Sequence, residues 1–157
     1  MIRVGFGMDV HRFAAGRELW IGGVKIPYEY GLDGHSDADV LIHAICDALL
    51  GAANLRDIGF QFPDNSDEFL NIDSKILLSR TCKLLTEKGY RIGNIDATVA
   101  AQVPKLNPHI PSMQQAMAAV MGIDADMVSI KATTTEKLGY EGRKEGITAY
   151  AVVLIEK

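Results

Sequence analysis

The 157-residue chain has few of the groups that would build a covalent framework, a membrane span or a nucleic-acid surface. Its two cysteines, Cys46 and Cys82, do not form a CxxC pair, so we expect reduced thiols in a cytosolic protein. The net charge is −4 without a basic block, which argues against nucleic acid as the main partner. No apolar run approaches membrane-spanning length, and the N-terminus lacks the charged and apolar pattern of a signal segment. We therefore expect a soluble, cytoplasmic protein with no membrane partner.

Several common catalytic motifs are also missing. The glycine-rich stretch 139–146 matches neither the P-loop nor the dinucleotide-binding fingerprint. No Ser–His–Asp arrangement has support in the sequence, and neither cysteine has an evident activating neighbour. Covalent catalysis is therefore not expected.

What is present predicts one α+β domain over residues 1–157. Hydrophobic residues make up 48% of the chain, enough for a real core. Strands are predicted at 2–10, 90–103, 127–133 and 147–155, and a hairpin at 18–27 turns at Gly22-Gly23. Helices are predicted from Ser36 or Asp37 to about Ala53, from Asp73 or Ser74 to Gly89, and from Pro108 to Gly122, with a long loop at 54–71. We expect a single-domain two-layer sandwich, a mixed sheet with helices packed on one face.

Asp9-Val10-His11 follows an apolar run, and His43 lies in a stretch with helical spacing. In a strand, Asp9 and His11 point to the same face. A carboxylate and two imidazoles would leave one position of a tetrahedral metal open, as in catalytic sites. An isolated D-x-H is more often an ordinary strand end than part of a metal site. Here three of the four histidines fall within residues 11–43, which favours the metal site. Asp39 and Asp47 share the spacing of four with His43, and we expect them to orient a ligand histidine or ring hydroxyls.

Two further segments carry groups suited to phosphate. His35-Ser36 precedes the predicted helix, whose N-terminal N–H groups and dipole favour an anion; simple capping is the alternative. Residues 133–136 end a predicted strand and offer three threonine hydroxyls and the carboxylate of Glu136, which suits a hard metal ion. A threonine-rich exposed strand explains them without a ligand, and on these residues alone it is the favoured interpretation.

Two loops are open to two interpretations, as ligand-binding segments or as ordinary connections. Residues 101–106 end a strand in a proline-bounded loop, whose free backbone groups would read the edge of a small ring or only connect two elements. Residues 139–146 are predicted to form a mobile hairpin loop, in which Arg143 would clamp a phosphate.

Taken in order, these segments resemble the 2-C-methyl-D-erythritol 2,4-cyclodiphosphate synthase family of the non-mevalonate isoprenoid pathway. No single segment is decisive, whereas the ordered set is specific and covers almost the whole chain. The matching segments are Gly5–His11, Ile21–Pro27, His35–Val40, Asp47–Ala53, Asp57–Gly59, Phe62–Asp64, Pro104–Lys105 and Lys131–Gly139.

The resemblance implies roles for particular residues. Zinc would be bound by Asp9, His11 and His43. The methylerythritol phosphate part would contact Asp9, His11, His35, Ser36, Asp57, Ile58, Gly59, Phe62, Pro63, Asp64, Asn65 and Ser66. Cytidine and its diphosphate would contact Ala101, Pro104, Lys105, Leu106, Ala132, Thr133, Thr134, Thr135 and Glu136, with Glu136 on a magnesium or manganese ion. Tyr140 and Arg143 match further contact positions, and the family is a homotrimer with sites shared between neighbouring subunits.

The implied reaction releases CMP from a cytidine diphosphate ester that carries a second phosphate. That phosphate attacks the β-phosphorus and closes a cyclic diphosphate, with His35 and Thr134 as the expected transition-state donors. Two departures from the family pattern stand out. Ser66 replaces the second acid of F-P-D-x-D, and Tyr150 stands where some members carry an acid near the trimer axis.

Two other functions use the same residues. A metal-dependent phosphohydrolase would employ water as the nucleophile and release inorganic phosphate or a linear ester. A non-catalytic trimeric module would bind CDP or CTP without turnover. Product analysis separates the three.

Overall fold

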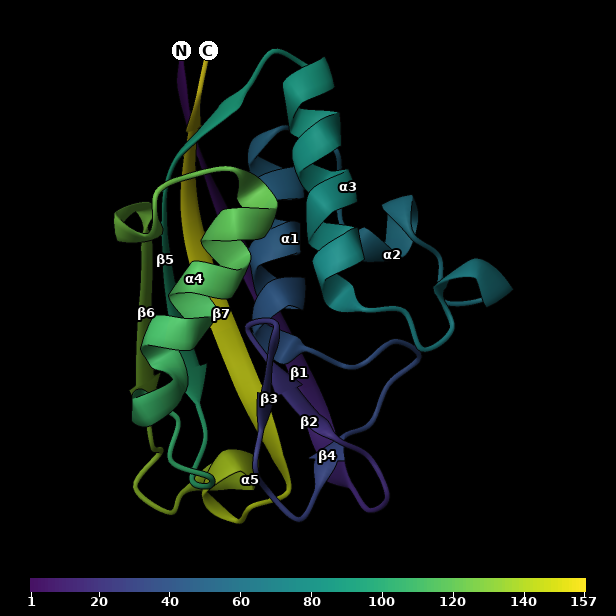
Figure 1. Ribbon diagram of the computed structural model, residues 1–157, viewed down its shortest axis with the longest axis vertical. Coiled ribbons are helices and arrows are strands. Elements are labelled where there is room, and N and C mark those ends of the chain that lie inside the picture. Colours follow the sequence, from purple (N-terminus) through teal and green to yellow (C-terminus); the bar gives the residue numbers. More distant parts are fainter.

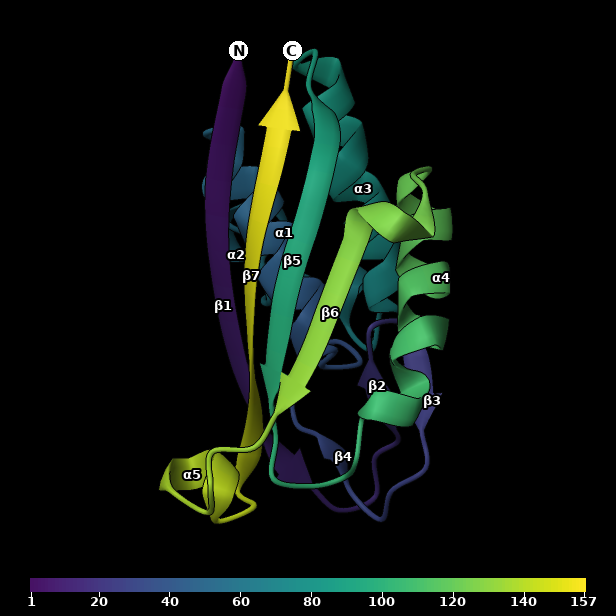
Figure 2. The ribbon, with the colours of Figure 1, turned by 90° about the vertical axis from the view of Figure 1, so that its left-hand side faces the viewer.

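The computed structural model describes residues 1–157, and its elements form two layers, a sheet and a set of helices (Figures 1 and 2). The strands are β1 Ile2–Ala14, β2 Leu19–Ile21, β3 Val24–Ile26, β4 Gly31–Leu32, β5 Arg91–Ala100, β6 Val128–Thr133 and β7 Gly146–Glu156. The helices are α1 Val40–Ala52, α2 Ile58–Gln61, α3 Ser74–Glu87, α4 Ile110–Met121 and α5 Gly139–Gly142, with single 3₁₀ turns at 67–69, 107–109 and 125–127.

Five strands form a mixed sheet in the order β4-β1-β7-β5-β6, while β2 and β3 pair separately as a hairpin. Only β5 and β6 run parallel; the other neighbours are antiparallel. The helices α1, α3 and α4 all lie on one side of this sheet (Figure 2). The expected mixed α+β architecture is confirmed.

Helix α1 is the centre of the core. It is apolar nearly all round, with Gly51 and Asp47 its only residues that are not buried. A helix of this kind must be covered on every side. Here it packs against the sheet strands β1 and β7 and against helix α3.

Two glycines let β1 approach α1 unusually closely. A Cβ built on Gly5 would lie 1.9 Å from the carbonyl oxygen of Ala48, and one on Gly7 would lie 2.0 Å from that of Ala44. Any side chain at either position would therefore separate the strand from the helix. Since Asp9 follows Gly7 and His43 precedes Ala44, this contact also sets the spacing of the predicted metal ligands.

The opposite face of the sheet is open and apolar. Even-numbered residues of β1 point away from the helices, so that Val4 and Phe6 keep 67% and 64% of their surface exposed. Tyr150 and Val152 of β7 lie on the same face, and the rings of Phe6 and Tyr150 stack with centroids 6.4 Å apart. A contiguous apolar patch of this kind is typical of an interaction surface.

Several predicted boundaries were right. The hairpin turns at Gly22-Gly23, Asp73 caps α3, and α4 ends at Gly122 in the left-handed conformation. The first helix starts later than predicted, because Asp39 and not Ser36 or Asp37 accepts from the N–H of Ile42.

Other predictions need correction. The loop at 54–71 contains α2 and a 3₁₀ turn, and the stretch 139–146 begins with the helical turn α5 rather than a hairpin loop. No helix in the chain combines the length and the apolar character needed to cross a membrane.

Candidate metal and substrate site

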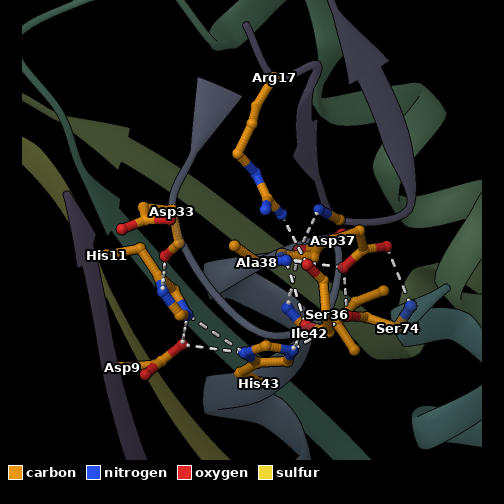
Figure 3. A network of polar contacts seen from close by, with 12 residues as sticks. Asp9, His11, Arg17, Asp33, Ser36, Asp37, Ala38, Ile42, His43 and Ser74 are labelled. Atoms are coloured by element: carbon orange, nitrogen blue, oxygen red, sulfur yellow. Dashed lines mark hydrogen bonds and ion pairs between the residues drawn. The ribbon is translucent and has the colours of Figure 1, made fainter. Parts of the chain in front are cut away.

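Asp9, His11 and His43 meet between β1 and α1 (Figure 3). The Asp9 carboxylate lies 2.8 Å from Nε2 of His11 and 3.1 Å from Nδ1 of His43. The two imidazole nitrogens lie 3.3 Å apart. Ligands about 2.0 Å from a tetrahedral ion are separated by about 3.3 Å, so these three atoms fit one metal ion after small adjustments.

The remaining ring nitrogens have partners of their own. Nδ1 of His11 lies 2.8 Å from the backbone oxygen of Asp33 and can only donate to it. Nε2 of His43 lies 2.9 Å from the hydroxyl of Ser74 and 3.2 Å from that of Ser36. Outer partners of this kind fix the tautomer and orientation of ligand histidines. They leave Nε2 of His11 and Nδ1 of His43 directed at the common centre.

The cluster has strong internal electrostatics without a metal. Burial opposes ionisation of Asp9, but the interactions of its carboxylate with His11 and His43 outweigh it and lower the pKa of Asp9 to about 2. Burial also opposes protonation of His11, yet the hydrogen bond and charge of Asp9 leave the pKa of His11 raised. The charge of Asp9 thus favours a cation here, and a proton and a metal ion compete for Nε2 of His11.

The two acids predicted to orient the histidine, Asp39 and Asp47, form hydrogen bonds with backbone N–H groups instead. The buried carboxylate of Asp39 accepts from the N–H groups of Gly22 and Gly23, at 2.9 and 2.7 Å, and so ties the β2–β3 hairpin to α1. Asp47 accepts from the N–H of Ile58 at 2.8 Å. Neither carboxylate forms a hydrogen bond with His43. Asp39 is the N-cap residue of α1, and its carboxylate also accepts from the N–H of Ile42.

The residues predicted for the methylerythritol part gather beside the cluster. His35, Ser36, His43, Ile58, Phe62 and Asp64 line a small cavity of about 30 Å³ together with Phe69, Ile72 and Leu77. Asp57 caps α2, whose first turn holds Ile58 and Gly59, and Pro63 and Asn65 lie in the turn that follows. Ser66 uses its hydroxyl to accept from the N–H of Glu68, while its carbonyl oxygen lies 3.1 Å from Nε2 of His35.

Arg17 was not predicted from the sequence. Its guanidinium donates to the backbone oxygens of Gly34, at 3.1 Å, and Ser36, at 2.6 Å. These two carbonyls flank His35, so Arg17 fixes the loop that presents it. A single arginine in a turn carries no sequence signal for such a role.

The predicted cytidine-side segments lie together, but away from the cluster. Ala101 donates to the carbonyl of Thr133 at 2.9 Å, and Gln102 accepts from the N–H of Lys137 at 3.0 Å. The sheet register aligns Asp9, Ala149, Val99 and Ala132 in one row. Three strand spacings separate Asp9 from Ala132, about 14 Å. One chain therefore carries the two halves near opposite edges of its sheet.

The chain is similar to known proteins over nearly its whole length. A profile described as the YgbB family matches residues 2–156. The chain belongs to the YgbB family. A curated relative from Bacteroides fragilis, named 2-C-methyl-D-erythritol 2,4-cyclodiphosphate synthase, is 69% identical over 99% of this chain and 98% of its own length.

Solved structures of YgbB relatives share the fold. A bifunctional IspDF from Campylobacter jejuni is 44% identical with a TM-score of 0.95, covering 99% of this chain, which spans 42% of that longer protein. An IspF from Plasmodium falciparum, described as a CDP complex, is 38% identical with a TM-score of 0.86. That alignment covers 98% of this chain and 95% of the other.

Three more of the predicted contacts have defined surroundings in this YgbB chain. Tyr140 shares a hydrogen bond of 2.5 Å with Thr148 and, with His11, lines an open cavity of about 1000 Å³ at the end of β1. Arg143 pairs with Glu145 at 2.8 Å. The exposed carboxylate of Glu136 makes no hydrogen bond or ion pair within the chain. Its role at a second metal stays a prediction.

Proposed function

We propose that this chain converts 4-diphosphocytidyl-2-C-methyl-D-erythritol 2-phosphate into 2-C-methyl-D-erythritol 2,4-cyclodiphosphate and CMP, a phosphorus–oxygen lyase reaction of the non-mevalonate pathway. The observation that carries the proposal is the Asp9–His11–His43 cluster in a chain that belongs to the YgbB family. Synthase relatives match this chain over nearly its whole length. The proposed location is the cytoplasm.

The reaction needs no nucleophile from the protein. An oxygen of the 2-phosphate attacks the β-phosphorus, the bond from that phosphorus to the bridging oxygen of CMP breaks, and CMP leaves with the electron pair. The protein has to align attacking oxygen and phosphorus and to stabilise the charge that accumulates. This requirement agrees with the absence of a catalytic triad from the sequence.

Zinc is the ion that we propose for Asp9, His11 and His43. One carboxylate and two imidazoles are a donor set that zinc accepts, and the set leaves one position open. Bound there, zinc would supply Lewis-acid polarisation of a substrate phosphate oxygen and a template for its position. Magnesium or manganese is proposed for Glu136, because such ions are usually held by one or two carboxylates together with substrate phosphates.

His35 and Thr134 are the donors proposed for the transition state. His35 is supported by its location beside the cluster, on a loop that Arg17 holds through two carbonyls. Thr134 belongs to the cytidine-side segment at the far edge of the sheet. A site that uses both residues is therefore easiest to build from two chains.

We also propose that the protein is a homotrimer whose active sites lie between subunits. The open apolar face of β1 and β7 supports burial against other copies, since Val4 and Phe6 are otherwise left in water. The separation of about 14 Å between Asp9 and Ala132 supports completion of each site by a neighbour. Phe6→Asp is expected to yield monomers in native mass spectrometry, whereas Ile76→Asp on the outer face of α3 keeps the trimer.

Product analysis tests the proposed activity. The purified protein should release CMP and a cyclic diphosphate from the nucleotide ester, and should lose this activity when the metal is chelated. His43→Ala should lose zinc and nearly all turnover, while His109→Ala, outside the cluster, should lose neither. Inorganic phosphate or a linear ester as the product would identify a phosphohydrolase instead. Nucleotide binding without turnover would identify a binding module.

A further inference from the structure

The third ligand histidine is held by a hydrogen-bonded chain that ends on a carboxylate. Ser74, the first residue of α3, is fully buried, and its hydroxyl oxygen lies 2.9 Å from Nε2 of His43. The same hydroxyl donates to Oδ1 of Asp37, and the backbone N–H of Ser74 donates to Oδ2 at 3.0 Å. In Figure 3, Ser74 and Asp37 lie on the side of the His43 ring that faces away from Asp9 and His11.

The direction of each hydrogen bond follows from the chemistry of the last member. An ionised carboxylate only accepts, so the hydroxyl proton of Ser74 points to Asp37. The lone pairs of that hydroxyl then face His43. Nε2 of His43 must carry a proton to bond with them, and in the neutral ring Nδ1 is left with a free lone pair. Nδ1 is the atom that faces Asp9 and His11.

A competing acceptor makes this control necessary. Oδ2 of Asp9 lies 3.1 Å from Nδ1 of His43, within reach of a hydrogen bond from a protonated Nδ1. If the proton of His43 lay on Nδ1 and was donated to Asp9, the nitrogen that should bind a metal ion would have no free lone pair. Ser74 and Asp37 act on the other side of the ring and hold the proton on Nε2.

The nearby hydroxyl of Ser36 does not decide the tautomer. It lies 3.2 Å from Nε2 of His43 and accepts from the N–H of Ala38 at 3.1 Å. Its own proton is not committed to a carboxylate, so it can donate to Nε2 or accept from it. Ser74 differs because its hydroxyl already donates a hydrogen bond to the carboxylate of Asp37.

We propose that Ser74 and Asp37 are positioning residues that fix the Nε2–H tautomer of His43 and thereby keep Nδ1 available to a metal ion. The part of this inference that concerns metal affinity rests on the proposed zinc site. The part that concerns the tautomer is a property of the metal-free protein.

Nitrogen-15 NMR of the histidine rings in the metal-free protein at pH 8.5 tests the tautomer directly. His43 signals are assigned by their loss in His43→Gln. The wild-type protein should carry the proton on Nε2. In Ser74→Ala the proton should move toward Nδ1, whereas Ser79→Ala, an exposed serine on the same helix, should leave the spectrum of His43 unchanged.

Asp37→Asn gives a second variant that keeps Ser74 in place. An amide does not oblige the serine hydroxyl to donate to it, so the hydroxyl is free to turn and donate to Nε2. The proton of His43 should then shift to Nδ1, as in Ser74→Ala. This variant decides the question if Ser74→Ala fails to fold.

Zinc affinity, measured by competition with a chelator, should fall about 10- to 100-fold in Ser74→Ala and Asp37→Asn and stay unchanged in Ser79→Ala. A wild-type proton on Nδ1, or an unchanged tautomer in Asp37→Asn, would overturn the inference. Wild-type protein that binds no zinc would overturn the proposed metal site instead, and the tautomer measurement would still decide the role of Ser74 and Asp37.

Discussion

Gly7→Ala should disturb the Asp9–His11–His43 cluster without changing any of its three residues. The added Cβ would lie 2.0 Å from the carbonyl oxygen of Ala44 and 2.7 Å from the N–H nitrogen of Ala48. Real Cβ atoms essentially never approach closer than 3.0 Å, so strand and helix must separate by about 1 Å. Asp9 and His11 move with the strand, and His43 moves with the helix.

The displacement exceeds what the cluster tolerates. Metal–ligand distances hold within about 0.2 Å of their preferred values, so a separation of about 1 Å should weaken zinc binding severely. Overpacking in a core costs about 1–3 kcal/mol. For a chain of this length, that corresponds to a fall in Tm of about 2–12 °C.

Thermal unfolding of the metal-free protein and zinc affinity of the folded protein measure the two effects separately. The matched control is Gly51→Ala on α1, where the new methyl meets nothing within 4 Å and the helix should gain slightly in stability. Wild-type zinc affinity in a destabilised Gly7→Ala protein would refute the coupling between helix approach and metal site. Wild-type stability would refute the packing argument itself.

Three other outcomes are expected. Arg17→Ala should release the loop 34–36 and lower kcat/KM about 10-fold or more with little change in zinc content. Arg17→Lys should not restore the activity, because one ammonium does not reproduce the fork that spans two carbonyls. Unchanged steady-state kinetics in Arg17→Ala, with metal content measured alongside, would show that the loop is rigid without Arg17. Burial, reinforced by the charge of Asp37, raises the pKa of Asp39 from 3.8 to about 6. Between these pH values the folded state binds a proton on Asp39 that the unfolded state does not. The contribution of Asp39 to the free energy of unfolding should therefore fall by about 3 kcal/mol as pH rises through that window. Urea unfolding should show this slope in the wild type and not in Asp39→Asn. Burial raises the pKa of the Cys82 thiol to about 11, so iodoacetamide at pH 8 should label it much more slowly in the native protein than after unfolding. Equal labelling rates in the two states would contradict the raised pKa.

Much of the architecture could be predicted because local signals agree with the tertiary structure. Gly22-Gly23 turns a hairpin in any context that lets the strands pair, and Gly122 ends α4 because it adopts the left-handed conformation at little cost. The start of α1 was harder. Ser36, Asp37 and Asp39 are all good caps, and the choice among them depends on the hairpin amides that only Asp39 reaches.

The site was predictable to the extent that its residues are chemically distinctive. A carboxylate and two imidazoles in one N-terminal stretch suggested a metal, and the fold brings those three side chains together. Arg17 and Ser74 have no such signature, since each acts through contacts with residues far away in the sequence. The distance between the Asp9–His11–His43 cluster and the segments proposed for cytidine follows from strand order, which the sequence pattern does not determine.

The two ends of the chain suggest how the protein tolerates attachments. Met1 and Lys157 are hydrogen-bonded neighbours at one end of the sheet (Figure 1). Asp9 lies eight residue steps from Met1 along the extended β1, about 26 Å. A tag or a second domain joined to either end would therefore begin far from the metal cluster. Linking the two ends directly and opening the chain elsewhere should likewise leave the active-site geometry intact.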